Sequence, residues 1–473
     1  MFTADRRACS AISKWHRCPP KWSEIPVRQS FENMRAQRAA VCKLSLLAVA
    51  SAELAISSEG RREEAGLLDF EVPNVESLRM RGADKDWLSL ALMDARNHTL
   101  RWISAYEREL AQQGGVVPCL AELNPPLWEL GHIGWFQEHW ISRNLQRQRG
   151  ERCDPSQSRL ASLCAHADRW YDPGQVLHDS RWQLDLPGLQ DTRQYLVDTL
   201  EVTLELLEGT PDSDDALYFY RLALFHEDMH IEAFACMSQT LGFDAGLLPR
   251  QTDAVVREAL MFPATPWTLG TGPGGFVFDN ERGPHEVAVL EFEIDAQPVT
   301  WAMYCEFAED GGYDERRHWS ADGWAWVQRE SRRTPRHVEQ MRHGVLQRRL
   351  GKLLRVPPQQ PVVHVSWYEA DAWCRWAGRR LPSEVEWETA AHLGASRGFR
   401  WGQVWEWTAS TFRAYPGFEA GPYRDYSQPW FGTHKVLRGA SLATRGRMRS
   451  PKFRNFYLPQ RDDPFCGFRS CAA

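Results

Sequence analysis

Residues 224–232 of this 473-residue chain read Leu-Phe-His-Glu-Asp-Met-His-Ile-Glu, and the rest of the sequence is organised around them. They lie in a long run with helical periodicity that contains neither proline nor glycine. Residues four apart share one face of a helix, so His226 and His230 are expected to point the same way. Two neutral imidazoles at this spacing can chelate a metal, although helical histidine pairs also arise by chance as solvated or core residues.

The composition is that of a water-soluble globular protein with room for two or three domains. A net charge of −6 leaves no basic surface on which bulk nucleic-acid binding could depend. The 22 tryptophans are far above ordinary usage, and chains rich in tryptophan bury large aromatic surfaces and often build cation-recognising pockets.

The 11 cysteines are odd in number and include no Cys-x-x-Cys pair, which indicates a reducing compartment rather than a disulfide framework. The apolar run at residues 44–56 is too short to cross a bilayer and too far from Met1 to be an ordinary signal peptide. We therefore expect a cytoplasmic protein that contacts no membrane.

The periodic pattern begins just after Met80. Residues 1–79 specify no element well, and we interpret them as an extension that is disordered or an over-extended start. Residues 80–250 are expected to form a four-helix domain. Its helices should span residues 84–113, a segment starting after Asn124-Pro125-Pro126, residues 189–208, and residues 214–242.

After Gly242 the helical periodicity fades, and short strand-like runs appear among many glycines, prolines and tryptophans. Examples are residues 267–271, 285–289 and 436–439. The sequence therefore predicts a second domain, over residues 255–473, of mixed α and β structure with long irregular loops.

His132 lies on the second expected helix, which in a bundle can face the helix of His226 and His230. Together they would offer three imidazole nitrogens to one metal, although His132 alone equally fits a core histidine. No cysteine lies near them in sequence, which disfavours a thiolate zinc site. Three histidines leave neighbouring positions open on an octahedral ion, as in non-haem iron oxygenases.

The stretch from His226 to His230 also fits the His-Glu-x-x-His pattern of zinc proteases, with Glu227 as general base. The residues that follow lack the glycine and third histidine of one large protease group. A zinc protease stays open as an alternative at this point.

Residues 365–370 and 373–388 (reading Trp-Cys-Arg-Trp-Ala-Gly-Arg-Arg-Leu-Pro-Ser-Glu-Val-Glu-Trp-Glu) resemble the formylglycine-generating-enzyme fold, a C-type-lectin-like α+β domain. Residues 404–408, 437–441 and 467–469 continue the resemblance in order, so that it covers about 255–470. Formylglycine generation itself is not expected, because no cysteine follows the glycine turn at residues 442–445.

Taken with a helical bundle that resembles the DinB-like type, this domain makes everything after Met80 similar to the ergothioneine sulfoxide synthase family. The resemblance implies a mononuclear non-haem iron, Fe(2+), held by His132, His226 and His230. It also implies oxidative C–S bond formation with O2 on the imidazole of hercynine, the trimethylated form of histidine.

Several residues carry over from the family by motif. Asn455 and Phe456 match the Asn and aromatic that hold the trimethylammonium, and an aromatic face suits a cation that cannot donate hydrogen bonds. Tyr423 and Tyr426 resemble a tyrosine pair in which the first would donate a proton and the second lines the hercynine pocket. The same tyrosines could instead be loop packing.

Departures from the family pattern fall where the sulfur donor binds. Tyr457 replaces an Asp, His178 replaces one of two arginines of which Arg181 is kept, and Met229 replaces a Gln. Arginine is suited to bidentate carboxylate recognition, so these changes argue against γ-glutamylcysteine and for a neutral, hydroxyl-rich donor.

This pattern resembles the selenoneine synthase branch of the family, which implies an enzyme that joins hercynine to selenium from a selenosugar. The alternative is an ergothioneine-type sulfoxide synthase that uses a thiol donor. A reading from another class is a non-catalytic protein that only binds a small cation.

Overall fold

A computed structural model describes residues 75–112 and 114–473 of the chain. Residues Val72–Ala473 form one compact unit. The first described helix, α2 (Val75–Arg81), lies mostly within the segment interpreted as an extension, so regular structure begins before Met80. The rest of that prediction, for residues 1–74, lies outside the described residues.

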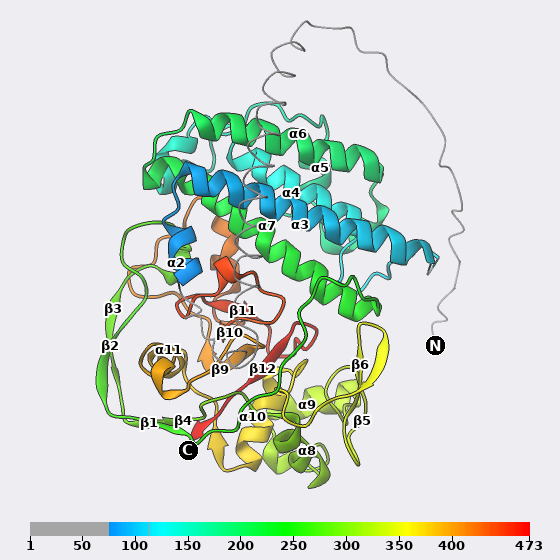
Figure 1. The fold of residues 1–473 in the computed structure, drawn as a ribbon, viewed down its shortest axis with the longest axis vertical. Helices are drawn as coiled ribbons and strands as arrows, with labels where there is room; N and C mark the ends of the chain where they lie inside the picture. Colours follow the sequence, from blue (N-terminus) through cyan, green and yellow to red (C-terminus); the bar gives the residue numbers. More distant parts are fainter. Residues whose placement is uncertain (1–74, 113) are drawn as a thin grey trace, which may run out of the picture. The chain divides into compact units, whose positions relative to one another are not determined.

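The structure confirms the four long helices, and Figure 1 shows them together above the rest of the fold. They are α3 (Lys85–Gln112), α4 (Pro126–Trp140), α6 (Leu189–Glu208) and α7 (Asp214–Leu241). Helix α4 packs on α6 and α7, and α3 packs on the same two helices. Short helices between them are η1 (Arg147–Arg152), α5 (Ala167–Tyr171) and η2 (His178–Gln183).

The ends of α7 follow from local chemistry. Ser213 caps its first turn by accepting a hydrogen bond from the backbone N–H of Ala216. Gly242 ends it in the left-handed conformation, with φ of 77°, which a residue without Cβ adopts at no cost. The 28 residues between them are mostly buried, because α7 is covered by other elements along much of its length.

The remainder of the chain combines short sheets and helices. One four-stranded sheet has the order β1-β4-β13-β8, a second has the order β11-β10-β9-β12, and two smaller sheets pair β2 with β3 and join β5, β6 and β7. The strands are β1 (Leu260–Phe262), β2 (Thr265–Leu269), β3 (His285–Val289), β4 (Phe292–Ile294), β5 (Val338–Gln340), β6 (Leu346–Arg349), β7 (Lys352–Arg355), β8 (Arg379–Arg380), β9 (Trp405–Thr411), β10 (Lys435–Gly439), β11 (Asn455–Tyr457), β12 (Cys466–Phe468) and β13 (Cys471–Ala472). The helices are α8 (Trp301–Glu309), α9 (Ala321–Glu330), α10 (Trp367–Trp376) and α11 (Glu384–Leu393).

Strand β11 carries two of the predicted binding residues at the edge of its sheet. It runs antiparallel to β10, with Asn455 opposite Leu437 and Phe456 opposite Val436. The residue before it, Arg454, is buried and forms an ion pair with Glu384, with Nε 2.8 Å from the carboxylate. This pair anchors the start of β11 against α11.

Helix α7 is tied to both halves of the fold by three acidic residues, of which Glu227 and Asp228 are buried. Glu227 pairs with Arg96 of α3 at 2.9 Å, inside the bundle. Asp228 instead pairs through both oxygens with Arg447, at 2.6 and 2.8 Å. Glu232 accepts hydrogen bonds from Trp405, Ser441 and Thr444, at 2.6–2.8 Å.

Because residues Val72–Ala473 pack as one unit, the domain limits 80–250 and 255–473 stay predictions from sequence. In the described part of the chain, no helix combines the length and the apolar character needed to span a bilayer.

We expect Arg447→Ala to lower the free energy of unfolding by about 3–5 kcal/mol, because it leaves the Asp228 carboxylate buried without its partner. Urea denaturation followed by tryptophan fluorescence measures this change. Arg193→Ala is the matched control, since the pair of Arg193 with Glu107 is partly exposed and should contribute about 0–1 kcal/mol. Equal losses in the two variants would contradict the expectation.

Candidate metal centre

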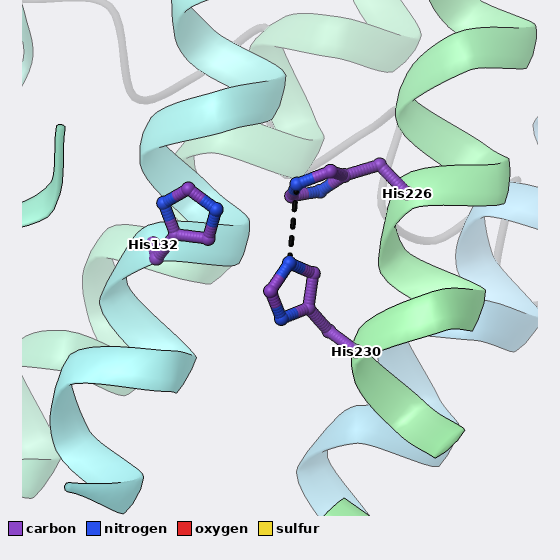
Figure 2. A group of neighbouring side chains, drawn as sticks. All are labelled: His132, His226 and His230. Carbon is purple, nitrogen blue, oxygen red and sulfur yellow. Dashed lines mark hydrogen bonds between the residues drawn. The ribbon is translucent and has the colours of Figure 1, made fainter. Parts of the chain in front are cut away.

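Three histidines from two helices converge in the bundle (Figure 2). His132 lies on α4, and His226 and His230 lie one turn apart on α7. Each offers a ring nitrogen, and these three atoms lie within 4.8 Å of one another. In the described residues this is the one group of three or more histidine, cysteine, aspartate or glutamate side chains so arranged.

The opposite ring nitrogens of two histidines already have partners. His132 Nδ1 lies 2.8 Å from the carbonyl oxygen of Tyr171, and His230 Nδ1 lies 2.6 Å from Oε1 of Glu129. Both partners are acceptors, so each Nδ1 carries the proton and each Nε2 keeps its lone pair. Metal-binding histidines in proteins are typically held in this way.

Aromatic rings pack against the histidine cluster. His226 stacks face to face on Phe136, with ring centroids 3.5 Å apart, and His132 stacks on Trp128 at 4.9 Å. Burial lowers the pKa of His132 to about 3 and that of His226 well below its ordinary value. Both imidazoles are therefore neutral near pH 7, which is the form that binds a metal.

These residues fit a divalent metal held by neutral nitrogens. The cluster contains no thiolate and no carboxylate, and it supplies only three ligand atoms, so further positions would stay open for other molecules. Glu227, the base required by the protease alternative, is held by Arg96 and by Thr99, whose Oγ1 lies 2.7 Å away. These contacts hold the Glu227 carboxylate in the interior of the bundle.

A cavity of about 330 Å³ is lined by residues of α7 and of the sheet that contains β11, and the three histidines are not part of its wall. Five predicted binding residues line it, namely Met229, Tyr426, Asn455, Phe456 and Tyr457. Glu129 also lines this cavity while it holds His230, so one side chain joins the cavity to the histidine cluster.

Three predicted residues lie outside the cavity wall. Tyr423 packs edge-on against Phe136, with ring centroids 5.0 Å apart, and lines a separate small pocket with Tyr426. His178 binds the carbonyl oxygen of Leu123 through Nε2, at 2.9 Å. Arg181 stacks on Trp128 and is not part of the cavity wall.

Sequence reasoning missed other polar residues of the wall. Glu129 and Asn124 hydrogen-bond to each other at 2.9 Å, and Glu232 lies one turn from Cys236 on the cavity side of α7. Glu129 could have been found, because it precedes His132 by three residues and so shares its helix face. Arg461 gives no such signal, because its partner Asp463 and its place in the wall depend on a loop.

Comparison with known proteins adds the family. The model of the sulfatase-modifying factor enzyme 1-like domain (FGE-sulfatase) matches residues 245–403, which supports the predicted formylglycine-generating-enzyme-like fold of that region. A hercynine oxygenase of Mycolicibacterium smegmatis is 32% identical over 444 residues, which cover 81% of this chain and 98% of that relative. This chain belongs to the hercynine oxygenase family.

Other members and partial relatives agree with this assignment. The hercynine oxygenase of Mycobacterium tuberculosis is 31% identical over 81% of this chain and 97% of its own length. The formylglycine-generating enzyme of Streptomyces coelicolor is 34% identical over 176 residues, covering 33% of this chain and 52% of that enzyme. The hercynine oxygenases thus match most of this chain, and the formylglycine-generating enzyme matches 33% of it.

We expect His132→Ala to weaken metal binding by more than the roughly 10–100-fold that follows loss of a neighbouring hydrogen-bond partner, because it removes a ligand itself. Metal content after dialysis against a divalent metal measures the loss. The control is His139→Ala on the same helix, since His139 belongs to no such cluster. Full metal content in the His132 variant would exclude a three-histidine centre.

Proposed function

We propose that this hercynine oxygenase homologue is a non-haem iron(II) enzyme that uses O2 to join the imidazole carbon of hercynine to the sulfur of a thiol donor. The observation that carries the proposal is the cluster of His132, His226 and His230 beside a cavity with aromatic walls. The four long helices would be a DinB-like bundle. Iron(II) bound by these histidines would supply the activation of O2.

The overall reaction balances as hercynine plus thiol plus O2 giving the sulfoxide plus water. A C–H bond and an S–H bond break, a C–S bond and an S=O bond form, and O2 is the oxidant. One oxygen atom leaves as water with the two hydrogens. The protein's own residues then have to hold the two substrates, exclude water and handle protons.

The aromatic wall suits the trimethylammonium group of hercynine. Phe456 is supported from behind by Phe412, with stacked ring centroids 4.1 Å apart, and Tyr426 meets Phe456 edge-on at 5.9 Å. A quaternary ammonium gains from aromatic faces and from negative charge without needing a hydrogen-bond acceptor. Carboxylates in the same wall include Glu129 and Glu232. We propose that Asn455, Phe456 and Tyr426 bind hercynine.

We propose Tyr423 as the proton donor. Its ring centroid lies 6.3 Å from that of His226, one of the three candidate ligands. Burial, followed by Asp425, raises the pKa of Tyr423, so its hydroxyl keeps the proton near pH 7. Tyr426 is also kept protonated, because burial raises its pKa.

The donor end of the cavity argues against a dicarboxylate thiol. Among the described wall residues the one guanidinium is that of Arg461, and Asp463 occupies it through two bonds of 2.5 and 2.7 Å. Met229 and Tyr457 add no positive charge. A small thiol such as cysteine, or a neutral thiosugar, fits this wall better than γ-glutamylcysteine.

A selenosugar is the second candidate donor, giving a C–Se bond as in selenoneine synthesis. Met229, Tyr457 and Met237 form an uncharged part of the wall, which favours an uncharged, polarisable donor there, and selenium is more polarisable than sulfur. The homologues support the sulfur reaction more directly, since their family is defined by hercynine oxygenation.

The eight cysteines of the described residues are all free, which supports a reducing compartment and the cytoplasmic location that we propose. The substrates of the proposed reaction are small molecules, and the acidic net charge offers no surface for nucleic acid.

The test is an anaerobic mixture of iron(II)-loaded protein, hercynine and one donor, followed by a pulse of O2 and mass spectrometry. Donors are γ-glutamylcysteine, cysteine, a thiosugar and a selenosugar, each alone. We expect a product equal to hercynine plus donor plus O2 minus water with a neutral or small thiol. Absence of any O2-dependent adduct with all four donors would refute the proposed enzyme, and an adduct with the selenosugar alone would select the second candidate.

Phe456→Leu should weaken hercynine binding roughly tenfold or more, since a desolvated cation–π contact contributes about 2 kcal/mol. Anaerobic calorimetric titration of the iron-loaded protein measures this. Phe431→Leu is the control, because Phe431 packs on Phe412 at 4.9 Å but does not line the cavity. If both variants bind hercynine like the parent protein, Phe456 is not its aromatic partner.

A further inference from the structure

Arg181, on the short helix η2, lies against two side chains that lead toward the histidine cluster. Its guanidinium carbon is 3.7 Å from the ring centroid of Trp128, so the planar group covers one face of the indole. Its Nη1 donates a hydrogen bond of 2.7 Å to Oδ1 of Asn124. The side chain is half-buried, and it is not part of the cavity wall.

The indole of Trp128 leads to the first metal ligand. The same indole stacks on His132, whose ring is nearly parallel to it at an interplanar angle of 7°. The edge of the indole is held as well, because its Nε1 donates to the carbonyl oxygen of Trp170 at 2.6 Å. Arg181 and His132 therefore both stack on Trp128, so the position of the indole links them.

The amide of Asn124 leads to the second metal ligand. Its Nδ2 donates to Oε2 of Glu129 at 2.9 Å, and Oε1 of the same carboxylate holds Nδ1 of His230 at 2.6 Å. The charges on the two sides set the orientation of the amide, since a guanidinium can only donate and an ionised carboxylate only accept. A hydrogen-bonded chain thus runs from Arg181 through Asn124 and Glu129 to His230.

We propose that Arg181 is a positioning residue of the metal centre, acting on His132 through Trp128 and on His230 through Asn124 and Glu129. The inference rests on the proposed function only in requiring that the histidines bind a metal. It gives Arg181 a task that does not depend on the donor substrate. Neighbouring partners of metal-bound histidines typically change metal affinity when they are lost.

The surroundings of Arg181 fit this task better than a grip on a donor carboxylate. One face of the guanidinium is covered by Trp128, and one of its nitrogens is engaged by Asn124. His178, one turn earlier on η2, has both ring nitrogens engaged, by Asp179 and by the carbonyl oxygen of Leu123. Asn124 and Glu129, not Arg181 and His178, reach the cavity.

The test uses cobalt(II) as a probe of the full-length apoprotein, with no substrate present. We expect Arg181→Met to weaken cobalt binding roughly 10–100-fold and to shift its visible absorption bands, because both ligands lose their orientation. Arg181→Lys keeps the charge but loses the planar stack, so its affinity should lie between those of Arg181→Met and the parent protein. Thermal unfolding of each apoprotein shows whether a variant has lost the fold instead.

Ser180→Ala is the matched control, since Ser180 precedes Arg181 on the same short helix and its hydroxyl donates to the carbonyl oxygen of Leu177, outside both chains of contacts. It should leave cobalt affinity and spectrum unchanged. A double variant, Arg181→Met with Asn124→Ala, tests the chain itself. If Arg181 acts partly through Asn124, the double variant binds cobalt more tightly than the product of the two single effects predicts.

Two results would overturn the proposal. One is parent-like cobalt affinity and spectrum in Arg181→Met while the KM for the donor rises, which assigns Arg181 to donor binding. The other is a loss of cobalt affinity in Arg181→Met that is fully additive with the loss in Asn124→Ala and that leaves the visible absorption bands of bound cobalt unchanged. Failure of the metal centre itself is distinguishable, because cobalt binding would then also survive in His132→Ala.

Discussion

The bidentate ion pair between Asp228 and Arg447 is the contact on which the geometry of the site depends. Asp228 stands between the two histidines of α7, and its side chain is fully buried. A buried carboxylate is tolerated only with a close counter-charge, so α7 cannot rotate or slide without breaking this pair. The rotation of α7 in turn sets the direction of both imidazoles.

The side chains of residues 226–232 of α7 point in all directions around the helix, because a helix turns by about 100° per residue. Glu227 faces the bundle, Asp228 and Glu232 face the sheet region, and the histidines face α4. Met229 is left for the cavity. One short segment therefore supplies metal ligands, anchors to both sides and part of the substrate wall, which leaves it little freedom to vary.

Much of this could be predicted from the sequence, and the reason is local. The four helices carry their own start and stop signals, such as Ser213 and Gly242, and the spacing of His226 and His230 depends only on the helix period. His132 required the further assumption that two helices face each other. The binding roles of Asn455 and Phe456 were expected from resemblance to the family motif, but their strand was not predicted, since β11 has only three residues.

The partners of the site residues could not be predicted, because they come from segments far apart in sequence. Nothing in the chain pairs Glu129 with His230, or Arg447 with Asp228, until the fold brings them together. The same holds for Arg181, whose role by resemblance was donor binding but whose contacts are with Trp128 and Asn124. The charge and residue type of Arg181 indicated which chemistry it can perform, but its neighbours are known only from the tertiary structure.

The long-range ties of α7 have a consequence for how the protein is made. Asp228 and its arginine are 219 residues apart, and Glu232 and Ser441 are 209 apart. A ribosome releases α7 long before it has synthesised these partners, and synthesis proceeds at about 5–20 residues per second. For tens of seconds the nascent helix therefore carries acidic side chains that must stay hydrated. The ties of α7 to Ser441 and Arg447 form only after that part of the chain has left the ribosome and docked.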